Sequence, residues 1–515
     1  MAPSSTRPLW PLRLLVVCFV TCTAVWHLWS AAQGHTNYRA QHLGTALRYA
    51  EGRIDLLRPV IVGFNANEAP TALEFPIWQA AAALLFKAFG TWTGWANVAS
   101  LLFLLAGLWP LFQLARRYLG ERGAWWALVF FTAQPNIVLL GGRGGTDGSC
   151  LVLTLWFVYF AERLLRELRW KWFVGALVFG ALSAVTKAPF FFAAGLALVF
   201  LLLAQRERRW GPWVALSSVG VLATATFAVW MRHAYGLAAL AEFPLVDVRF
   251  SARTGDMTSA WWYFGDWSYR LDPRNWIKGA WRFTHLELGG AALVGLLGAG
   301  FLVLRGGLAV HWFAAGAVAT LVFSHLVLHH GNYYLMFSPA VAMLFAAATL
   351  RLEDALQVGA RVRELLFCSG AALVLALSCV QSLIVMEVGL EADPYPHRIA
   401  RLIREHTNES DKLLVQGDGW GGGALIRAGR RGLSIWTTQF LEKPENLARI
   451  RELGFTKLVM ISESPLLAAV QQINPGQAER KRQSYRDAMT PVVADWPTLI
   501  ENEDILIKAI PAASP

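Results

Sequence analysis

Long apolar runs, separated by short polar breaks, make up most of the first 390 residues of the chain. A run of about 20 apolar residues crosses the hydrocarbon of a bilayer as a helix, because the helix satisfies its backbone donors and acceptors internally. The pattern therefore predicts a polytopic membrane protein with about eleven spans. These are residues 10–32, 93–115, 123–140, 148–162, 172–187, 188–204, 211–231, 287–304, 308–328, 333–350 and 365–388.

One further apolar run, from Pro76 to Gly90, is short. Proline suits the first turn of a helix, and the run is too short to cross comfortably. We predict a half-buried helix that lies along the outer interface. The alternative, an ordinary span, would move every later loop to the opposite side of the membrane.

After the last span the pattern changes to short apolar strands that alternate with helices. A helix is predicted over 396–406, strands over 412–415, 433–436 and 456–461, and a helix over 442–453. Such alternation indicates a small α/β domain. We therefore divide the chain into a transmembrane domain, residues 1–388, and a C-terminal α/β domain, residues 389–515. The glycine-rich stretch 417–423 lacks the Lys-Ser/Thr ending of a phosphate-binding loop and is interpreted as an ordinary loop.

Basic residues mark one side of the predicted bundle. Loops rich in Lys and Arg resist translocation, so a cytoplasmic N-terminus should put the basic breaks in the cytoplasm. Alternate breaks do carry them, which predicts a multi-pass plasma (inner) membrane protein with an extracytoplasmic C-terminal domain. The length of the first run and the absence of a clear small-residue cleavage site favour a retained anchor over a signal peptide. The basic residues are Arg116, Arg117, Arg122, Arg163, Arg166, Arg169, Lys171, Arg206, Arg208, Arg209, Arg305, Arg351, Arg361 and Arg363.

Composition supports this view. Hydrophobic residues make up 55% of the chain and charged residues 16%. The net charge of +11 is spread over short clusters rather than gathered in one stripe, so nucleic acid is not an expected partner. The five cysteines lie in or beside apolar runs without metal-site spacing, and we predict neither disulfides nor a metal site.

Three acidic residues stand out in the outer breaks. Glu68 and Glu74 lie in the long outer segment, residues 33–92, and Asp147 lies in a glycine-rich turn between two spans. Carboxylates beside a membrane are costly unless paired or used. Glu74 precedes the predicted interfacial helix and is either a catalytic group or a helix cap. Asp147 offers the same two alternatives.

Two cations and a histidine–tyrosine turn are the other candidates. Arg143 and Lys187 lie on the side that should be poor in cations, so each needs an anionic partner, either a phosphate or a carboxylate. Snorkelling of Lys187 toward the interface is the alternative. The turn containing His329, His330, Tyr333 and Tyr334 joins two spans, and we favour substrate contact there over metal binding.

These features together resemble the GT-C superfamily of membrane glycosyltransferases, which includes protein O-mannosyltransferases and aminoarabinose transferases. The resemblance covers nearly the whole chain and depends on the order and sidedness of its motifs. The motifs are Tyr38-Arg39-Ala40-Gln41 with Thr45, Leu73-Glu74-Phe75-Pro76, Arg143 with Asp147, Thr186-Lys187, and His330 through Tyr334.

The resemblance implies a glycosyltransferase that inverts the anomeric carbon. A polyprenyl-phosphate monosaccharide would be the donor, an unidentified lipid, glycan or protein of the envelope the acceptor, and no cofactor would be required. Basic residues would hold the lipid phosphate, and a carboxylate would act as base. The implied substrate-binding residues are Arg39, Gln41, Arg143, Lys187, His329, His330, Tyr333 and Tyr334.

One departure concerns the base. The family commonly has an acidic pair near the end of the first span, where this chain has Gly34-His35-Thr36-Asn37-Tyr38-Arg39. His35 could replace it, or Glu74, Asp147 or Glu68 could, and we rank Glu74 and Asp147 first.

Two other classes fit the hydropathy pattern. A transporter or flippase would be expected to carry polar residues near the middle of its spans and to show repeated halves. A non-catalytic envelope protein would tolerate changes in the loop charges.

Overall fold

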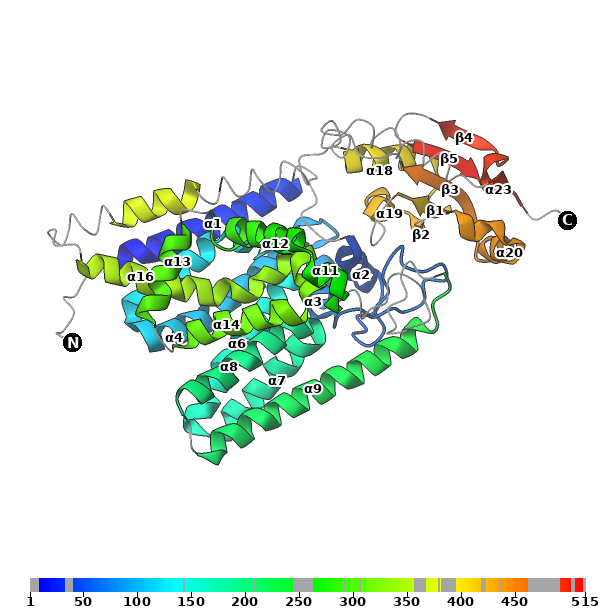
Figure 1. Cartoon of the computed structure of the whole chain (residues 1–515). Helices are drawn as coiled ribbons and strands as arrows, with labels where there is room; N and C mark the ends of the chain where they lie inside the picture. Colours follow the sequence, from blue (N-terminus) through cyan, green and yellow to red (C-terminus); the bar gives the residue numbers. More distant parts are fainter. Residues whose placement is uncertain are drawn as a thin grey trace.

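A large bundle of helices is followed by a small sheet with its own helices (Figure 1). This arrangement, and the apolar character of the helices, confirm the predicted class of a helical membrane protein with a C-terminal α/β domain. The computed structural model describes residues 9–32, 40–141, 144–206, 209–243, 263–290, 293–304, 307–355, 367–377, 380, 395–417, 423–435, 438–461, 491–501 and 505–512.

Each predicted span overlaps an apolar helical stretch in the part of the chain that the structure describes, although residues 365–366, 378–379 and 381–388 of the last one lie outside it. In the described part of the chain, five helical segments are long and apolar enough to cross a membrane, and six apolar helices are shorter. The number of spans, eleven, stays a prediction. In chain order the helices of the bundle are α1 (Trp10–Ala32), α4 (Gly94–Ala133), α5 (Pro135–Gly141), α6 (Thr146–Glu167), α7 (Trp170–Thr186), α8 (Ala188–Ala204), α9 (Trp210–Ala238), α13 (Val294–Val303), α14 (Leu308–Val322), α15 (Ser324–His329), the 3-10 helix η2 (Gly331–Phe337), α16 (Ser338–Ala355) and a helix over Phe367–Leu377.

Helix α4 contains a break at Gly120, where φ is +73°. A side chain at this position would strain the left-handed backbone, whereas glycine adopts it readily. The break divides α4 into the two helices that the sequence predicts, and the basic cluster Arg116, Arg117 and Arg122 flanks it.

Short helices cover one end of the bundle. Helix α2 (Ala40–Glu51) and helix α3 (Ile77–Phe89) are joined by an irregular stretch, residues 52–76, which we call the α2–α3 segment. Helix α3 begins directly after Pro76, as predicted, and its 13 residues reach only about 20 Å. This length falls short of the hydrocarbon thickness, but α13 (Val294–Val303) in a predicted span is shorter still, so the interfacial position of α3 stays a prediction. Helices α11 (Trp267–Leu271) and α12 (Pro273–Leu286) follow α9.

A large apolar core lies within the bundle. Its largest fully buried side chains include Trp126 on α4, Phe157 on α6, Phe190 on α8 and Phe345 on α16. Helices α4, α6, α8 and α16 therefore form the centre of the bundle, while α1 and α9 expose many apolar side chains, as lipid-facing helices do.

The C-terminal domain is a mixed five-stranded sheet of order β2-β1-β3-β5-β4. Strands β1, β2 and β3 are parallel, and β5 is antiparallel to β3 and β4. The three parallel strands and two of the helices were predicted, whereas β4 and β5 were not. The elements are α18 (Tyr395–His406), β1 (Lys412–Gln416), α19 (Gly423–Ala428), β2 (Arg431–Ile435), the 3-10 helix η3 (Gln439–Glu442), α20 (Pro444–Glu452), β3 (Phe455–Ile461), α23 (Pro491–Ala494), β4 (Thr498–Glu501) and β5 (Ile505–Ala509).

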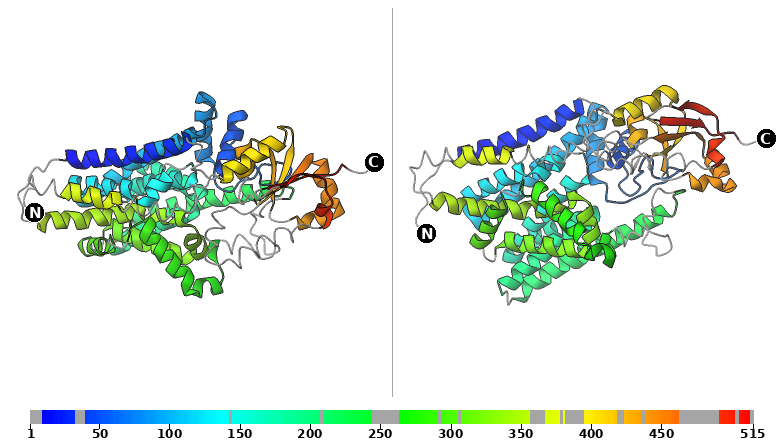
Figure 2. Two further views of the ribbon diagram at one scale, coloured as in Figure 1. Left: turned by 90° about the horizontal axis from the view of Figure 1, so that it is seen from above. Right: turned by 45° about the horizontal axis from the view of Figure 1, so that its top comes forward.

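The C-terminal domain lies beyond one end of the bundle, next to α2 and the end of α9, and α1 begins at the opposite end (Figure 2). Two ion pairs connect the domain to the rest of the chain, Glu68 with Arg431 and Glu242 with Arg449. We call this end of the bundle the domain end.

Candidate active site

A buried lysine lies where α7 stops and α8 starts. Lys187 is the single residue between these helices and has an extended backbone, with φ of −151° and ψ of 97°. The following residues Ala188 and Pro189 form the first turn of α8, where proline is well tolerated. The Lys187 side chain is only 2% exposed, so its ammonium needs anionic partners within the protein.

Glu74 is the first of these partners. It lies in the α2–α3 segment just before α3, and its carboxylate accepts hydrogen bonds from Lys187 Nζ and from the Thr146 hydroxyl. Burial alone would raise the pKa of the Glu74 carboxyl, but the nearby Lys187 ammonium and His42 hold it below its ordinary value. Glu74 is therefore a partly buried hydrogen-bond acceptor whose surroundings favour the ionised form.

Asp147 is the second partner. It lies in the first turn of α6, where the positive end of the helix dipole favours a carboxylate. Lys187 Nζ lies 3.2 Å from Asp147 Oδ1, and Asn332 Nδ2 donates to the same oxygen at 2.7 Å. One ammonium thus links two carboxylates that are 73 residues apart in the sequence numbering.

His42 completes the cluster from the side of α2. Its Nε2 lies 3.6 Å from Glu74 Oε2 and 3.4 Å from the Thr146 hydroxyl, and its Nδ1 lies 3.0 Å from Gln79 Nε2 on α3. Sequence reasoning missed both His42 and Gln79. The signal was available for His42, because α2 is amphipathic and places His42, Thr45, Ala46 and Tyr49 on one buried face.

The residues of the histidine–tyrosine turn do not all lie at the Lys187 cluster. The Tyr333 ring centroid lies 5.0 Å from Lys187 Nζ, a cation–π distance. Tyr334 points to α12 instead, where its hydroxyl donates to the Gly279 carbonyl at 3.0 Å. His329 stacks on His325 with ring centroids 5.2 Å apart, and His330 lies edge-on to His329 at 4.8 Å.

The remaining predicted site residues lie elsewhere. Gln41 lines, with His42, Thr45 and Glu74, a small cavity of about 10 Å³, close to the space that one water molecule requires. Glu68 does not join the Lys187 cluster; its described partners are Arg48 and Arg431. Arg39, Arg143 and also His35 lie outside the described residues.

Polar side chains continue beneath the cluster. The Thr154 and Ser183 hydroxyls are 2.7 Å apart, and Cys150 Sγ donates to the Ser183 carbonyl at 3.8 Å. A further buried carboxyl group, that of Glu287, accepts from Asn136 and, at 2.7 Å, from Ser338. Since Asn136 also donates to the Gly331 carbonyl at 3.3 Å, this group anchors η2 beside the site.

This arrangement suits proton transfer and anion stabilisation. Two carboxylates and one ammonium, all largely withdrawn from water, offer a proton acceptor and a cation within one hydrogen-bonded cluster. In the described part of the chain, no three His, Cys, Asp or Glu side chains are grouped as a metal site would require.

Comparison with known proteins places this cluster in context. The sequence profile of the dolichyl-phosphate-mannose-protein mannosyltransferase family matches residues 72–231. That stretch, somewhat under a third of the chain, contains Glu74, Asp147 and Lys187. No curated protein matches the chain at a significant level of sequence similarity.

Solved structures resemble the chain over most of its length. ArnT from Cupriavidus metallidurans bound to undecaprenyl phosphate is 14% identical, with a TM-score of 0.61 over 97% of this chain and 99% of that one. The oligosaccharyltransferase of Archaeoglobus fulgidus is 13% identical, with a TM-score of 0.53 over 89% of this chain and 70% of that one. The mycobacterial arabinofuranosyltransferase AftD is 15% identical, with a TM-score of 0.50 over 90% of this chain and 36% of that one. The expected resemblance is confirmed.

Proposed function

Because the chain has the GT-C glycosyltransferase fold, we propose that it transfers a sugar from a polyprenyl-phosphate donor to an acceptor hydroxyl outside the cytoplasm. The observation that carries this proposal is the buried cluster in which Glu74 and Asp147 share Lys187 at the domain end of the bundle. A transporter would be expected to place such groups near the middle of its spans.

The position of the cluster suits a lipid-linked donor. A polyprenyl tail partitions into the bilayer while its phosphate and sugar stay at the interface, so the reacting groups must meet where helices end and polar loops begin. Lys187 lies at such a helix end, and Tyr333 stacks beside its ammonium. The undecaprenyl phosphate bound to ArnT of similar fold supports a donor of this chemical class.

The reaction balances with the groups present. The acceptor oxygen forms a bond to the anomeric carbon, and the bond from that carbon to the phosphate oxygen breaks with its electron pair. Glu74 or Asp147 accepts the proton of the acceptor hydroxyl, and Lys187 stabilises the charge that grows on the departing phosphate. The products are a glycosylated acceptor and polyprenyl phosphate. A single displacement of this kind inverts the anomeric carbon.

The side of the membrane on which the site lies is inferred from the basic residues of the loops. The basic breaks predict a cytoplasmic N-terminus, and the C-terminal domain lies at the end of the bundle opposite the start of α1. We therefore assign the site and the C-terminal domain to the outer side of the plasma membrane. We assign residues 389–515 to the C-terminal domain. The proposed acceptor of the sugar is a lipid, glycan or protein of the envelope.

The test uses full-length protein in lipid nanodiscs with polyprenyl-phosphate monosaccharides, and measures release of polyprenyl phosphate by mass spectrometry. Glu74→Gln and Asp147→Asn should each lower the rate by roughly 10²–10⁴-fold, the usual contribution of a general base. Glu405→Gln, an exposed carboxylate of the C-terminal domain, is the matched control and should retain activity. Wild-type rates in both site variants would refute the catalytic assignment.

The same preparation separates transfer from transport. If the protein in reconstituted vesicles moves the intact donor across the membrane and releases no polyprenyl phosphate, it is a flippase instead.

A further inference from the structure

Part of the α2–α3 segment belongs structurally to the C-terminal domain. The Ser434 amide of the edge strand β2 donates to the Gly63 carbonyl at 2.9 Å, and Gly63 and Leu433 form a parallel bridge. The segment therefore extends the sheet by one short additional pairing, although more than 360 residues of chain separate the two partners.

The next residues enter the core of the domain. Ala66 is fully buried against an apolar cluster that includes Leu433 and Leu458. Lys412 at the start of β1 donates through Nζ to the Ala66 carbonyl at 2.7 Å and to the Leu453 carbonyl at 3.1 Å. The Lys412 ammonium thereby links the α2–α3 segment to strand β1.

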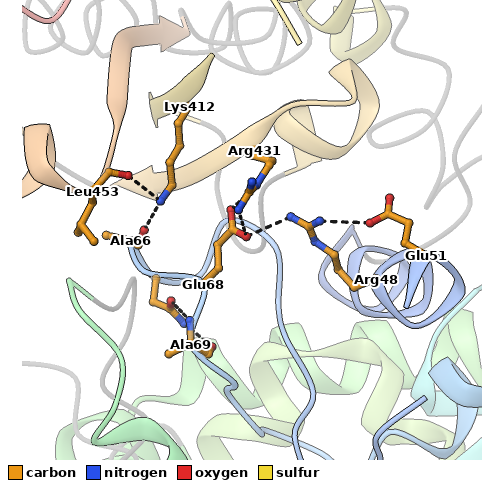
Figure 3. A network of polar contacts seen from close by, with 9 residues as sticks. Arg48, Glu51, Ala66, Glu68, Ala69, Lys412, Arg431 and Leu453 are labelled. Atoms are coloured by element: carbon orange, nitrogen blue, oxygen red, sulfur yellow. Dashed lines mark hydrogen bonds and ion pairs between the residues drawn. The ribbon is translucent and has the colours of Figure 1, made fainter. Parts of the chain in front are cut away.

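Glu68 then connects three parts of the chain (Figure 3). Its two carboxylate oxygens accept from Arg431 Nε at 2.9 Å and Arg431 Nη2 at 2.8 Å, and Arg48 Nη2 of α2 donates at 3.2 Å. Paired hydrogen bonds from a guanidinium fix a carboxylate in orientation as well as position. The backbone of Glu68 has φ of +51°, which a non-glycine residue adopts only where its surroundings hold it.

Further hydrogen bonds fix the residues around and between Glu68 and Glu74. The Asn65 side chain accepts from the Ala69 amide at 2.8 Å and donates to the Thr71 hydroxyl at 2.9 Å. The Thr71 amide donates to the Pro59 carbonyl at 2.7 Å, and the Phe75 amide to the Val185 carbonyl at 3.0 Å. The stretch between the domain and the candidate active site is therefore fixed on both sides of Glu74.

We propose that the C-terminal domain holds the Glu74 carboxylate in its working position through the Glu68–Arg431 contact. Glu68 is then a positioning residue, and the domain is an integral support of the active site rather than a cover over it. The kinetic part of this inference rests on the proposed glycosyl transfer, whereas its structural part does not.

The structural test is hydrogen–deuterium exchange of the full-length protein in nanodiscs. Arg431→Ala and Glu68→Gln should each accelerate exchange of the Thr71 and Phe75 amides by roughly tenfold, as expected when a charged contact that holds a segment is lost. Arg401→Ala is the matched control, since Arg401 is as exposed as Arg431 and pairs within its own helix with Glu405. Unchanged exchange at both amides in both variants would overturn the inference.

The kinetic test separates positioning from general stability. Both variants should lower kcat with little change in the donor KM, and Arg431→Lys, which keeps the charge, should recover part of kcat. Faster exchange together with a wild-type kcat would overturn the positioning role. If wild-type protein transfers no sugar, the proposed function fails, and the exchange measurement still decides whether the domain holds the segment.

Discussion

Asn332 donates a 2.7 Å hydrogen bond to Oδ1 of Asp147, although 185 residues separate them in the chain. Asn332 lies in η2 and Asp147 in the first turn of α6, so this contact joins η2 to the cluster. Lys187 Nζ approaches the same oxygen at 3.2 Å, so Asp147 Oδ1 has an amide and an ammonium as neighbours.

The first prediction concerns this contact. Asn332→Ala should lower the transfer rate by roughly tenfold, because Asp147 loses a buried donor that is worth about 1.5 kcal/mol. Asn332→Asp should lower it much further, since a second carboxylate would face Asp147. Steady-state release of polyprenyl phosphate checks both, and equal activity of the two variants would contradict the assignment.

The second prediction is a pH dependence. Lys187 and His42 hold the pKa of Glu74 below its ordinary value of 4.5 despite burial, so Glu74 should stay ionised down to lower pH than a free glutamate. In Lys187→Met the acid limb of the pH–rate profile should move to higher pH, and the rate at its plateau should fall. If the acid limb of Lys187→Met lies at the same pH as that of the wild type, Glu74 is not the titrating base.

The third prediction concerns stability at the domain contact. Burial raises the pKa of Glu68, but its hydrogen bonds with Arg431 and the charge of Arg48 outweigh this and hold the pKa below 4.5. A carboxyl whose pKa is depressed on folding stabilises the folded state above its ordinary pKa, and loses this effect as pH falls through the depressed value. Glu68→Gln should therefore cost about 1–2 kcal/mol at neutral pH. The difference in Tm between wild type and Glu68→Gln should therefore decrease as the pH falls below 4.5. A difference that does not depend on pH would contradict the assignment of an ion pair.

The fourth prediction concerns the other end of the bundle. Glu353 on α16 is 1% exposed and accepts from Arg122 Nε at 2.8 Å and Nη2 at 2.7 Å. Glu353→Gln should cost about 3–5 kcal/mol, because it removes the charge of the carboxylate that pairs with the largely buried Arg122 guanidinium. Thermal unfolding in detergent measures the loss. Glu121→Gln, an exposed neighbour whose nearest guanidinium nitrogen is 3.9 Å away, should lose less than about 1 kcal/mol.

Helix breaks were predictable from local chemistry. Gly120 ends a helix because it adopts a left-handed backbone, and Pro76 and Pro189 begin helices because the first turn accepts proline. The expectation that Lys187 needs an anionic partner also followed from its isolation on the side poor in cations. Its carboxylate partners, Glu74 and Asp147, are the two acidic residues ranked first as the base.

Long-range contacts were not predictable in the same way. Glu68 belongs with Arg431 only because the α2–α3 segment joins the C-terminal sheet, and a hydropathy pattern carries no information on pairings across 363 residues. Strand β4 was missed for a related reason, since this short strand at the edge of the sheet has a weak apolar alternation. Strand β5, which lies inside the sheet, was missed as well. His42 was missed because a single histidine on a buried helix face is an ambiguous signal.

The participation of Ala66 in the core of the sheet bears on how this chain can be divided. A fragment that starts at residue 389 would lack the alanine that fills this position, and it would leave the Lys412 ammonium with one carbonyl acceptor instead of two. The folded unit that contains the sheet is therefore discontinuous in sequence. Its core is complete only if the α2–α3 segment lies on the same side of the bilayer as the sheet, so correct insertion of the first helices is a condition for assembling it.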